Sequence, residues 1–154
     1  MRMLDDPIDV SGLAFKDTEG SPVTLADWNG RVVLFNLWAT WCAPCRAEMP
    51  ALEELEAKYG GDDFQVVPVS VDLGDDAKPK GFYQEINLKK LPFFHDGKMN
   101  LFNTMKKQGL AIGMPVTLLV DQNSCARAVL NGPAEWASDD AVNFIKTAIR
   151  LKSG

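Results

Sequence analysis

The sequence predicts an α/β protein in which a central sheet is flanked by helices. Residues 32–38 are apolar almost throughout rather than alternating, which is typical of a parallel strand buried on both faces. Residues 43–59 follow at once and place large apolar side chains at spacings of three and four, as in an amphipathic helix. A chain of 154 residues with 46% hydrophobic composition is long enough for one full core and too short for two typical domains. We therefore expect residues 1–154 to form a single domain.

The remaining elements alternate in the same way along the chain. Residues 13–15 and 22–25 flank a turn with Asp and Gly at 17–20, which predicts an N-terminal β-hairpin, and Trp28 is expected to cover the edge of the core. Turn residues and helical periodicity mark the other elements. These are strands at 64–71, 93–94, 116–120 and 126–130, and helices at 76–86, 98–107 and from Ser138 to Lys152.

Three details of these elements are more specific. Pro68 lies in the middle of the strand at 64–71, and because proline has no N–H to donate, we expect it at an edge or a bulge. In the helix at 76–86, Phe82 and Ile86 are expected to share the buried face. Ser138 is expected to act as the N-cap of the last helix.

Two cysteines, Cys42 and Cys45, stand between the apolar strand and the first helix. Residues three apart at the start of a helix are neighbours on one surface and can close a small disulfide ring. Cys42 would lie at the helix N-terminus, where unpaired N–H groups and the positive dipole end lower a thiol pKa from about 8.5 to roughly 3.5–7.5. Cys42 is thus predicted to be the nucleophile and Cys45 the resolving thiol. Pro44 suits the first helical turn, which needs no N–H from it.

Two other interpretations of the cysteine pair are open. A CxxC is also half of a structural zinc site, but no second CxxC exists and only Cys125 and His95 remain to complete one. The pair could also be two buried structural thiols, which would leave unexplained why an apolar strand delivers both to a helix start. We expect a reactive dithiol, and for His95 no role beyond filling the surface or the core. Cys125 follows a hairpin turn and is expected near the surface, remote from the pair and not catalytic.

The composition limits the classes of partner. A net charge of −5 and a pI near 4.8, without a cluster of Lys and Arg, argue against nucleic acid or an anionic membrane as the partner. No apolar run approaches the ~18 residues expected of a membrane span, and the first residues lack a signal-peptide pattern. Three cysteines are an odd number, which leaves Cys125 over once Cys42 and Cys45 pair.

The order of strands and helices around the cysteine pair resembles the thioredoxin fold, and three motifs narrow the resemblance to TlpA-type thioredoxins. They are residues 36–50 (NLWATWCAPCRAEMP), the turn at 113–115 (GMP) and residues 132–136 (GPAEW). The N-terminal hairpin and the additional strand and helix between 91 and 109 also match this family. The resemblance covers almost the whole chain. It implies a mixed central sheet flanked by helices, with an N-terminal β-hairpin and an inserted strand-helix segment.

The resemblance implies that the protein reduces disulfides of other proteins. TlpA-type proteins are exported, often membrane-anchored reductases that keep cysteines of client proteins reduced during the assembly of cytochromes c or cytochrome oxidase. The resemblance therefore implies a periplasmic protein-disulfide reductase, tethered to the inner membrane by a segment outside residues 1–154. It also implies clients such as a Sco-like protein, an oxidase subunit or apocytochrome c, and a membrane thiol reductase as electron donor. We expect a monomer, with no cofactor besides the Cys42–Cys45 disulfide.

The resemblance also assigns residues to a client-binding surface. The family's cis-proline maps onto Pro115, which would set the Met114 backbone beside Cys42, where it could pair with an extended client chain. Trp41, next to Cys42, is expected on the rim that contacts the client. Pro44, between the two cysteines, is expected to contribute to the same surface.

One departure from ordinary thioredoxin concerns proton transfer. The buried acid beneath the cysteines of thioredoxin corresponds to Asn36 here, which cannot accept a proton. Glu48 lies three residues after Cys45 on the same helix and is therefore expected to project near it. A carboxylate there disfavours a second negative charge on Cys45 and can accept its proton when Cys45 attacks. We expect Glu48 to act as the base, with partial access to solvent that keeps the effect of Glu48→Gln at or below the low end of the ~10²–10⁴-fold typical of general bases.

Two other functions remain as alternatives. A metallochaperone would bind Cu(I) through soft thiolates, but Cys42 and Cys45 have no evident His partner. A thiol peroxidase of related fold would use one reactive cysteine with a nearby Thr or Ser and would need no WCxxC motif. Copper titration of the reduced protein and an assay of peroxide consumption separate these alternatives from a reductase.

Overall fold

A mixed sheet of eight strands runs through the computed structural model, which describes residues 1–151. The strand order is β1-β8-β7-β4-β5-β6-β2-β3. In chain order the elements are β1 (Arg2–Asp9), β2 (Ala14–Asp17), β3 (Pro22–Thr24), the 3-10 helix η1 (Leu25–Trp28), β4 (Val32–Trp38), α1 (Ala43–Tyr59), β5 (Phe64–Ser70), α2 (Ala77–Glu85), β6 (Phe94–His95), α3 (Asn100–Lys107), β7 (Val116–Val120), β8 (Cys125–Asn131) and α4 (Asp139–Arg150).

Strand β4 is the centre of this sheet. All seven of its residues are buried, as its unbroken apolar sequence predicts. It pairs in parallel with β5 and antiparallel with β7, which makes the sheet mixed. The carboxyl ends of β4 and β5 and the start of β7 consequently meet at one edge of the sheet.

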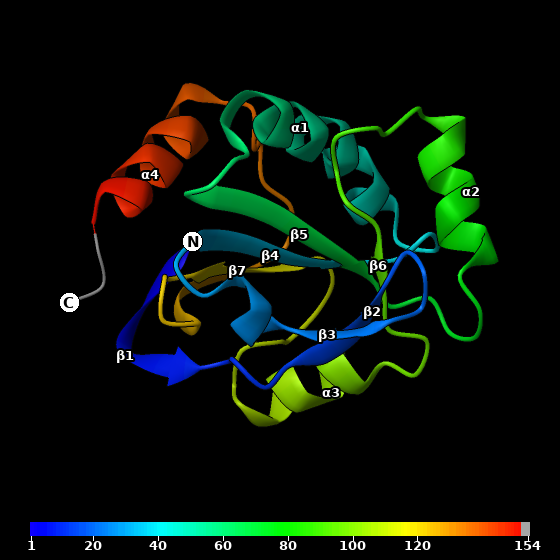
Figure 1. Ribbon diagram of the computed structural model, residues 1–154, viewed down its shortest axis with the longest axis horizontal. Coiled ribbons are helices and arrows are strands. Elements are labelled where there is room, and N and C mark those ends of the chain that lie inside the picture. Colours follow the sequence, from blue (N-terminus) through cyan, green and yellow to red (C-terminus); the bar gives the residue numbers. More distant parts are fainter. Residues whose placement is uncertain (152–154) are drawn as a thin grey trace.

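Helices cover both faces of the sheet. In Figure 1, α1 and α4 lie on one side of it and α3 on the other. Helix α1 has the predicted bounds and buries three apolar side chains, Met49, Leu52 and Leu55. Helix α3 buries Leu101 and Met105. The core is therefore built from both faces of β4 and its neighbours. Within residues 1–151, no helix is long and apolar enough to cross a membrane.

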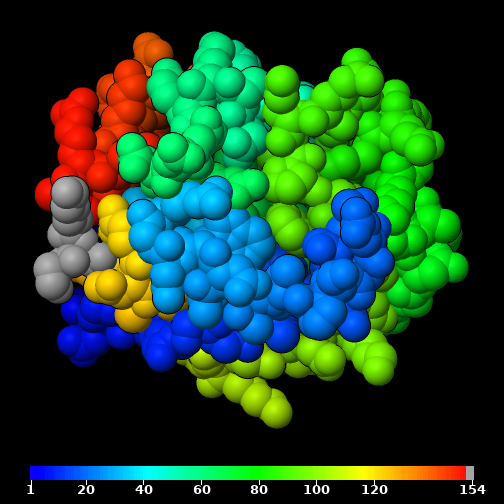
Figure 2. Space-filling view, viewed as in Figure 1, coloured from blue at the N-terminus to red at the C-terminus, as the bar shows by residue number. Residues whose placement is uncertain are grey.

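The N-terminal hairpin forms one edge of the sheet, where β2 pairs antiparallel with β6. Strands β2 and β3 pair antiparallel, as the turn at 17–20 predicts. Figure 2 shows this blue segment lying across the front between the red helix α4 and the green helix α2. Trp28 is 9% exposed and its ring stacks on Phe15, with centroids 5.9 Å apart. The prediction that Trp28 covers the core is confirmed.

The last helix begins as its sequence predicts. The Ser138 hydroxyl accepts a hydrogen bond from the backbone N–H of Ala141 at 3.2 Å, so Ser138 is the N-cap. Of the apolar residues of α4, Ile145 is buried, while Val142 and Ile149 pack against the core from half-buried positions. Lys152, expected in the last turn, lies outside the described residues.

The structure contains one strand that the sequence did not predict, and one expectation from the sequence is wrong. Strand β1 was not predicted, because most of its residues are exposed and it exists by pairing with β8 at the sheet edge. In α2 the buried residues are Pro79 and Tyr83. Ile86 is 36% exposed because it stands at the C-cap, beyond the last full turn. Phe82 is half-buried and contacts Trp38, with ring centroids 5.4 Å apart.

Pro68 lies inside β5 and not at a bulge. It stands opposite Asn36 in the unbroken parallel register of β4 and β5. On the other side of β5, the short strand β6 pairs only with Val69 and Ser70. Pro68 therefore lies beyond the end of β6, where a missing N–H costs no ladder hydrogen bond to that strand.

Candidate active site

The predicted dithiol lies where β4 passes into α1. Cys42 is the N-cap of α1 and keeps an extended backbone (φ −105°, ψ 103°), while Cys45 lies in the first turn. The two residues form a disulfide, with their Cα atoms 5.2 Å apart. The backbone N–H of Cys45 points at Cys42 Sγ at 3.3 Å, as toward an N-cap acceptor. The prediction of a disulfide-forming pair at a helix N-terminus is confirmed.

The two sulfurs differ in access and in electrostatic setting. Cys42 is 6% exposed, whereas Cys45 is fully buried. The first turn of α1 contains no acidic residue, so no side-chain charge there offsets the positive end of the helix dipole. An external sulfur can therefore approach Cys42, at the helix terminus, and is kept from Cys45.

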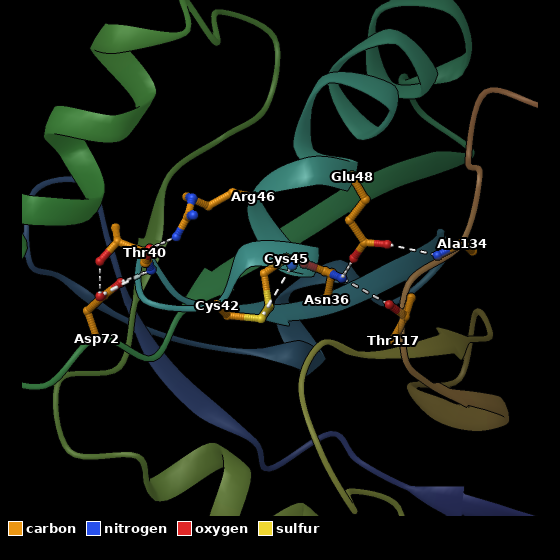
Figure 3. Close-up of a disulfide and its surroundings, with 9 residues drawn as sticks. All are labelled: Asn36, Thr40, Cys42, Cys45, Arg46, Glu48, Asp72, Thr117 and Ala134. Carbon is orange, nitrogen blue, oxygen red and sulfur yellow. Dashed lines mark hydrogen bonds between the residues drawn. A yellow bond between two sulfur atoms is a disulfide. The ribbon is translucent and has the colours of Figure 1, made fainter.

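Glu48 lies beside Cys45, and both oxygens of its carboxylate accept hydrogen bonds. Its Oε1 accepts from Asn36 Nδ2 at 3.0 Å. Its Oε2 accepts from the backbone N–H of Ala134 at 3.1 Å and from Trp136 Nε1 at 3.0 Å. Figure 3 shows Asn36 and Ala134 converging on the carboxylate beside Cys45. Glu48 is 4% exposed, so the expectation of partial solvent access is wrong for its carboxylate.

Burial raises the pKa of the Glu48 carboxyl above its ordinary value of 4.5, and the hydrogen bonds from Ala134, Asn36 and Trp136 offset only part of this effect. The Asn36 amide is fixed from two sides, because Nδ2 also donates to Thr117 Oγ1 at 2.9 Å. Its Oδ1 is buried without a hydrogen-bond partner among residues 1–151. Next to Cys45 there is thus an amide that cannot titrate and a carboxyl with raised proton affinity.

Sequence reasoning missed the groups that hold Glu48. Ala134 and Trp136 belong to the GPAEW motif at 132–136, which was noted for its resemblance and not for a contact. Thr117 lies in β7, opposite Asn36 in the antiparallel register. Asn36 and Thr117 are polar residues in two otherwise largely apolar strands that pair with each other. This pattern was the signal in the sequence that could have indicated their contact.

A second polar cluster holds the loop before Cys42. The backbone N–H and the hydroxyl of Thr40 both donate to the Asp72 carboxylate, at 3.1 and 2.5 Å. The Ser70 hydroxyl donates to the same carboxylate at 2.6 Å. Arg46, in the first turn of α1, donates to the Thr40 carbonyl oxygen. All polar groups of Thr40 are therefore occupied, and Figure 3 shows this cluster on the side of the disulfide away from Glu48.

Sequence reasoning also missed Asp72, which is 4% exposed. The position of Asp72 in the sequence could have predicted its contact. Strands β4 and β5 end side by side, with Trp38 opposite Ser70, so a carboxyl just after β5 lies beside the loop after β4. His95 supports the same loop, since its Nε2 is 2.8 Å from the Asp72 carbonyl oxygen. His95 is buried, so it lies in the core and not at the surface, which the sequence had left open.

The residues expected to bind a client lie on two loops and in the first turn of α1, around the disulfide. Trp41 is 59% exposed beside Cys42, and Pro44 is exposed in the first turn of α1. Met114 is half-buried, and Pro115 follows it through a cis peptide bond, as the resemblance implies. The structure thus places these residues at the sheet edge that carries the disulfide. Their contacts with a client stay predictions.

Cys125 lies far from the pair. It opens β8, is half-buried and forms no disulfide. The turn before it connects the end of β7 to β8, and β7 runs antiparallel to β4. Cys125 therefore lies at the end of the strands opposite to the end that carries the disulfide. Within residues 1–151, no group of three or more His, Cys, Asp or Glu side chains is placed to hold a metal ion.

A thioredoxin-like sheet with a disulfide pair at the start of α1 is the kind of site found in thiol–disulfide oxidoreductases. Residues 7–145 match the Redoxin family, and the chain belongs to this family. The thiol-disulfide oxidoreductase ResA of Oceanobacillus iheyensis is 34% identical over 118 residues, which cover 76% of this chain and 58% of that protein. The thioredoxin-like protein YneN of Bacillus subtilis is 47% identical over 57 residues, covering 37% of this chain and 33% of YneN.

Solved structures show the same architecture. A crystal structure from Chlorobium tepidum, assigned as a thiol:disulfide interchange protein DsbE, is 28% identical with a TM-score of 0.79 and covers 95% of this chain and 99% of its own. A DsbF homologue from Corynebacterium diphtheriae is 27% identical with a TM-score of 0.75, covering 97% and 91%. These findings confirm a TlpA/ResA-type thioredoxin-like protein. The chain spans 58% of the length of the ResA relative that it matches.

Proposed function

We propose that the protein is a protein-disulfide reductase that passes electrons from the Cys42–Cys45 dithiol to disulfides of client proteins. The observation that carries this proposal is the disulfide at the N-terminus of α1, with Cys42 6% exposed and Cys45 fully buried. Relatives named thiol-disulfide oxidoreductase ResA support it. The exchange needs no bound cofactor, because the cysteine pair itself carries two electrons.

In the first step, the Cys42 thiolate attacks one sulfur of the client's disulfide. A bond forms between Cys42 Sγ and that sulfur while the client's own S–S bond breaks, and the other client sulfur leaves as a thiolate that takes a proton from solvent. The helix terminus favours the Cys42 thiolate, because its dipole and unpaired N–H groups stabilise negative charge. Burial keeps Cys45 out of this step.

In the second step, the Cys45 sulfur attacks Cys42 Sγ. The Cys42–Cys45 bond forms, the bond to the client breaks, and the second client sulfur leaves as a thiolate. The pair has then lost two electrons and the client disulfide has gained them. We propose that Glu48 accepts the proton that the Cys45 thiol loses in this step. Its raised pKa and its position one helical turn from Cys45 suit a base. A cleft of about 640 Å³ between α1 and residues 133–138 includes Glu48 in its lining and offers the proton a way out.

The setting that we propose is the periplasm. The protein would be tethered to the inner membrane by a segment outside residues 1–154, and a membrane thiol reductase would regenerate its dithiol. Its clients would be a Sco-like protein, an oxidase subunit or apocytochrome c, during the assembly of cytochrome oxidase or cytochrome c. The support for this setting is the TlpA-type resemblance of residues 36–50, 113–115 and 132–136.

Trapping of the mixed disulfide tests the proposal. In the Cys45→Ser variant the second step cannot occur, so clients from a periplasmic extract should stay bound to Cys42 and be released by dithiothreitol. The Cys42→Ser variant is the matched control and should capture none. Capture of equal amounts by both variants would contradict the assignment of Cys42 as the nucleophile.

The redox potential tests the direction of electron flow. A reductant of this kind should have a potential of roughly −200 to −270 mV, measured by equilibrium titration against glutathione or dithiothreitol. A potential above about −150 mV would indicate an oxidant and overturn the proposed reductase.

A further inference from the structure

Three large apolar side chains stand exposed on the loops that surround the disulfide. Trp41 is 59% exposed, Leu73 is 71% exposed and Ile112 is 84% exposed. They follow β4, follow β5 and precede β7, and the register of these strands brings the three loops to one edge of the sheet. The other large hydrophobics exposed within residues 1–151 lie near the chain ends or after α2: Met1, Met3, Ile86 and Leu151. Apolar exposure concentrated at one site marks a surface that contacts a partner.

Trp41 and Leu73 line one cleft of about 500 Å³, which begins at the residue next to Cys42. Thr40 and Asp72, the residues of the buried polar cluster, also line it. Asp75 and Lys78 carry opposite charges in the same lining. The Asp72 carboxylate is buried and accepts hydrogen bonds from Thr40 and Ser70. Because the two remaining charges oppose each other and Trp41 and Leu73 are the large exposed side chains, the cleft suits an apolar group better than a charged one.

Hydrogen bonds hold the walls of this cleft. Thr40 is fixed by Asp72, and the N–H of Gly74 donates to the carbonyl oxygen of Gly97 at 3.0 Å. A Cβ atom at Gly97 would collide with the carbonyl oxygen of Gly74, so this close approach requires glycine. On the other side of the disulfide, the N–H of Ile112 donates to Asn131 Oδ1 at 2.8 Å. A surface held in this way loses little conformational entropy when a partner binds.

The chemistry of Cys42 determines what lies on this surface. Cys42 is 6% exposed, so a client sulfur reaches it only if the client backbone comes close to the protein. Residues beside the client cysteine are then carried over Trp41 and Leu73 on one side and over Ile112 on the other. A small thiol such as glutathione has no apolar side chains to cover these groups.

We propose that the Trp41–Leu73 cleft and Ile112 select clients whose reactive cysteine lies in an extended segment between large apolar residues. One flanking apolar side chain enters the cleft beside Cys42, and the other contacts Ile112. This inference rests on the proposed reductase function and adds the class of client segment to it. Leu73 and Ile112 are specificity-determining residues in this arrangement and take no part in the exchange of electrons.

Matched peptide substrates test this inference. One short peptide carries a central cysteine with Leu on both sides, and the other has Ser in place of Leu. Each is offered to the protein as a disulfide-linked dimer, with dithiothreitol present to regenerate the Cys42–Cys45 dithiol for turnover and the rate without protein subtracted. The wild-type kcat/KM should be about tenfold higher for the Leu peptide, because each partly buried Leu contributes to binding. Leu73→Ser should lower the kcat/KM for the Leu peptide about fivefold, and Leu73→Ser with Ile112→Ser should bring the two peptides to nearly equal values.

The control is Ile86→Ser, which removes an exposed apolar side chain away from the disulfide and should change neither kcat/KM. Equal wild-type rates for the two peptides, or an equal loss for both peptides in Leu73→Ser, would overturn the inference. Oxidised glutathione separates this outcome from failure of the proposed function. If the reduced protein reduces neither the peptides nor glutathione disulfide, the reductase function fails and the inference fails with it. If it reduces glutathione disulfide without discriminating the peptides, only the inference fails.

Discussion

Glu48 and Asp72 are two carboxyl groups with the same burial and different surroundings. Each is 4% exposed, and each accepts hydrogen bonds from three donor groups near the disulfide. The donors to Glu48 come from β4 and from the segment after β8, and its carboxyl lies on the side of the buried Cys45. The donors to Asp72 are Thr40 and Ser70, at the ends of β4 and β5.

This difference shows that burial alone does not determine what a carboxyl does. For Glu48 the cost of burial exceeds the effect of its three donors, so its pKa is raised and it can hold a proton. Asp72 instead connects Thr40 to Ser70, and so fixes the loop that carries Trp41 and leads to Cys42. We infer that Glu48 serves the chemistry of the resolving cysteine, whereas Asp72 positions the attacking one.

The largest effect that we expect is kinetic and concerns Glu48. Glu48→Gln keeps the size of the side chain but removes the base, so release of the client in the second step should slow by about 10²-fold, the low end of general-base effects. Stopped-flow fluorescence of the tryptophans during client reduction measures this rate. Glu54→Gln, on the exposed part of the same helix, is the control and should leave it unchanged. Equal release rates in Glu48→Gln and the wild type would leave water as the proton acceptor.

The next effect is on stability and concerns Asp72. Asp72→Ala leaves the N–H of Thr40 without its acceptor and frees the hydroxyls of Thr40 and Ser70, which should lower the free energy of unfolding by about 2 kcal/mol. Urea unfolding of the oxidised protein measures this loss. Asp62→Ala, at an exposed acid in the turn after α1, should change stability by less than about 0.5 kcal/mol. Equal stability of the two variants would show that Asp72 does not brace the loop.

A third carboxyl, Glu56, tests whether a raised pKa is visible in the stability of the protein. Burial raises the pKa of Glu56 to about 7 from 4.5, although it accepts a hydrogen bond from the Val66 N–H at 2.7 Å and Arg31 lowers it. Between these two pKa values the folded state holds a proton that the unfolded state has lost, so this contribution to stability falls as pH rises from 4.5 to about 7. The raised pKa of Glu48 likewise lowers the stability of the folded state as the pH rises above 4.5.

Denaturant midpoints measured across this pH range should therefore decrease, and Glu56→Gln should make the decrease shallower. The glutamine side chain can still accept the hydrogen bond from the Val66 N–H, so the substitution removes the titration of the carboxyl and keeps the hydrogen bond. A midpoint that decreases with pH as steeply in Glu56→Gln as in the wild type would contradict the raised pKa.

The smallest effect is expected at Cys125, which lies far from both carboxyl groups. Cys125→Ser should leave client reduction unchanged and shift stability by less than about 0.5 kcal/mol. Burial, with Asp121 and Asp9 nearby, raises the pKa of the Cys125 thiol, so its alkylation at neutral pH should be slow beside that of Cys42 in the reduced protein. A loss of turnover as severe as that of Cys42→Ser would show that Cys125 is catalytic.

The sequence by itself determined the elements whose signals lie within a few residues. The bounds of α1, the N-cap position of Cys42 and the burial of β4 follow from periodicity and capping, which depend on neighbours in the chain. The cis bond at Pro115 came from the family resemblance and not from the residues themselves. Local rules did not find β1, because its mostly exposed side chains carry no periodic signal and its partner strand, β8, lies more than a hundred residues further along the chain.

Only the tertiary structure decided the surroundings of the two carboxyl groups. Glu48 meets Trp136 across 88 residues of sequence, and Asp72 meets Thr40 across 32. Such contacts depend on which strands pair and in which register, and no local pattern encodes a hydrogen bond between groups that far apart. Sequence spacing could therefore place Glu48 near Cys45, but its burial, its donors and its raised pKa arise only when β4, α1 and the segment after β8 pack together.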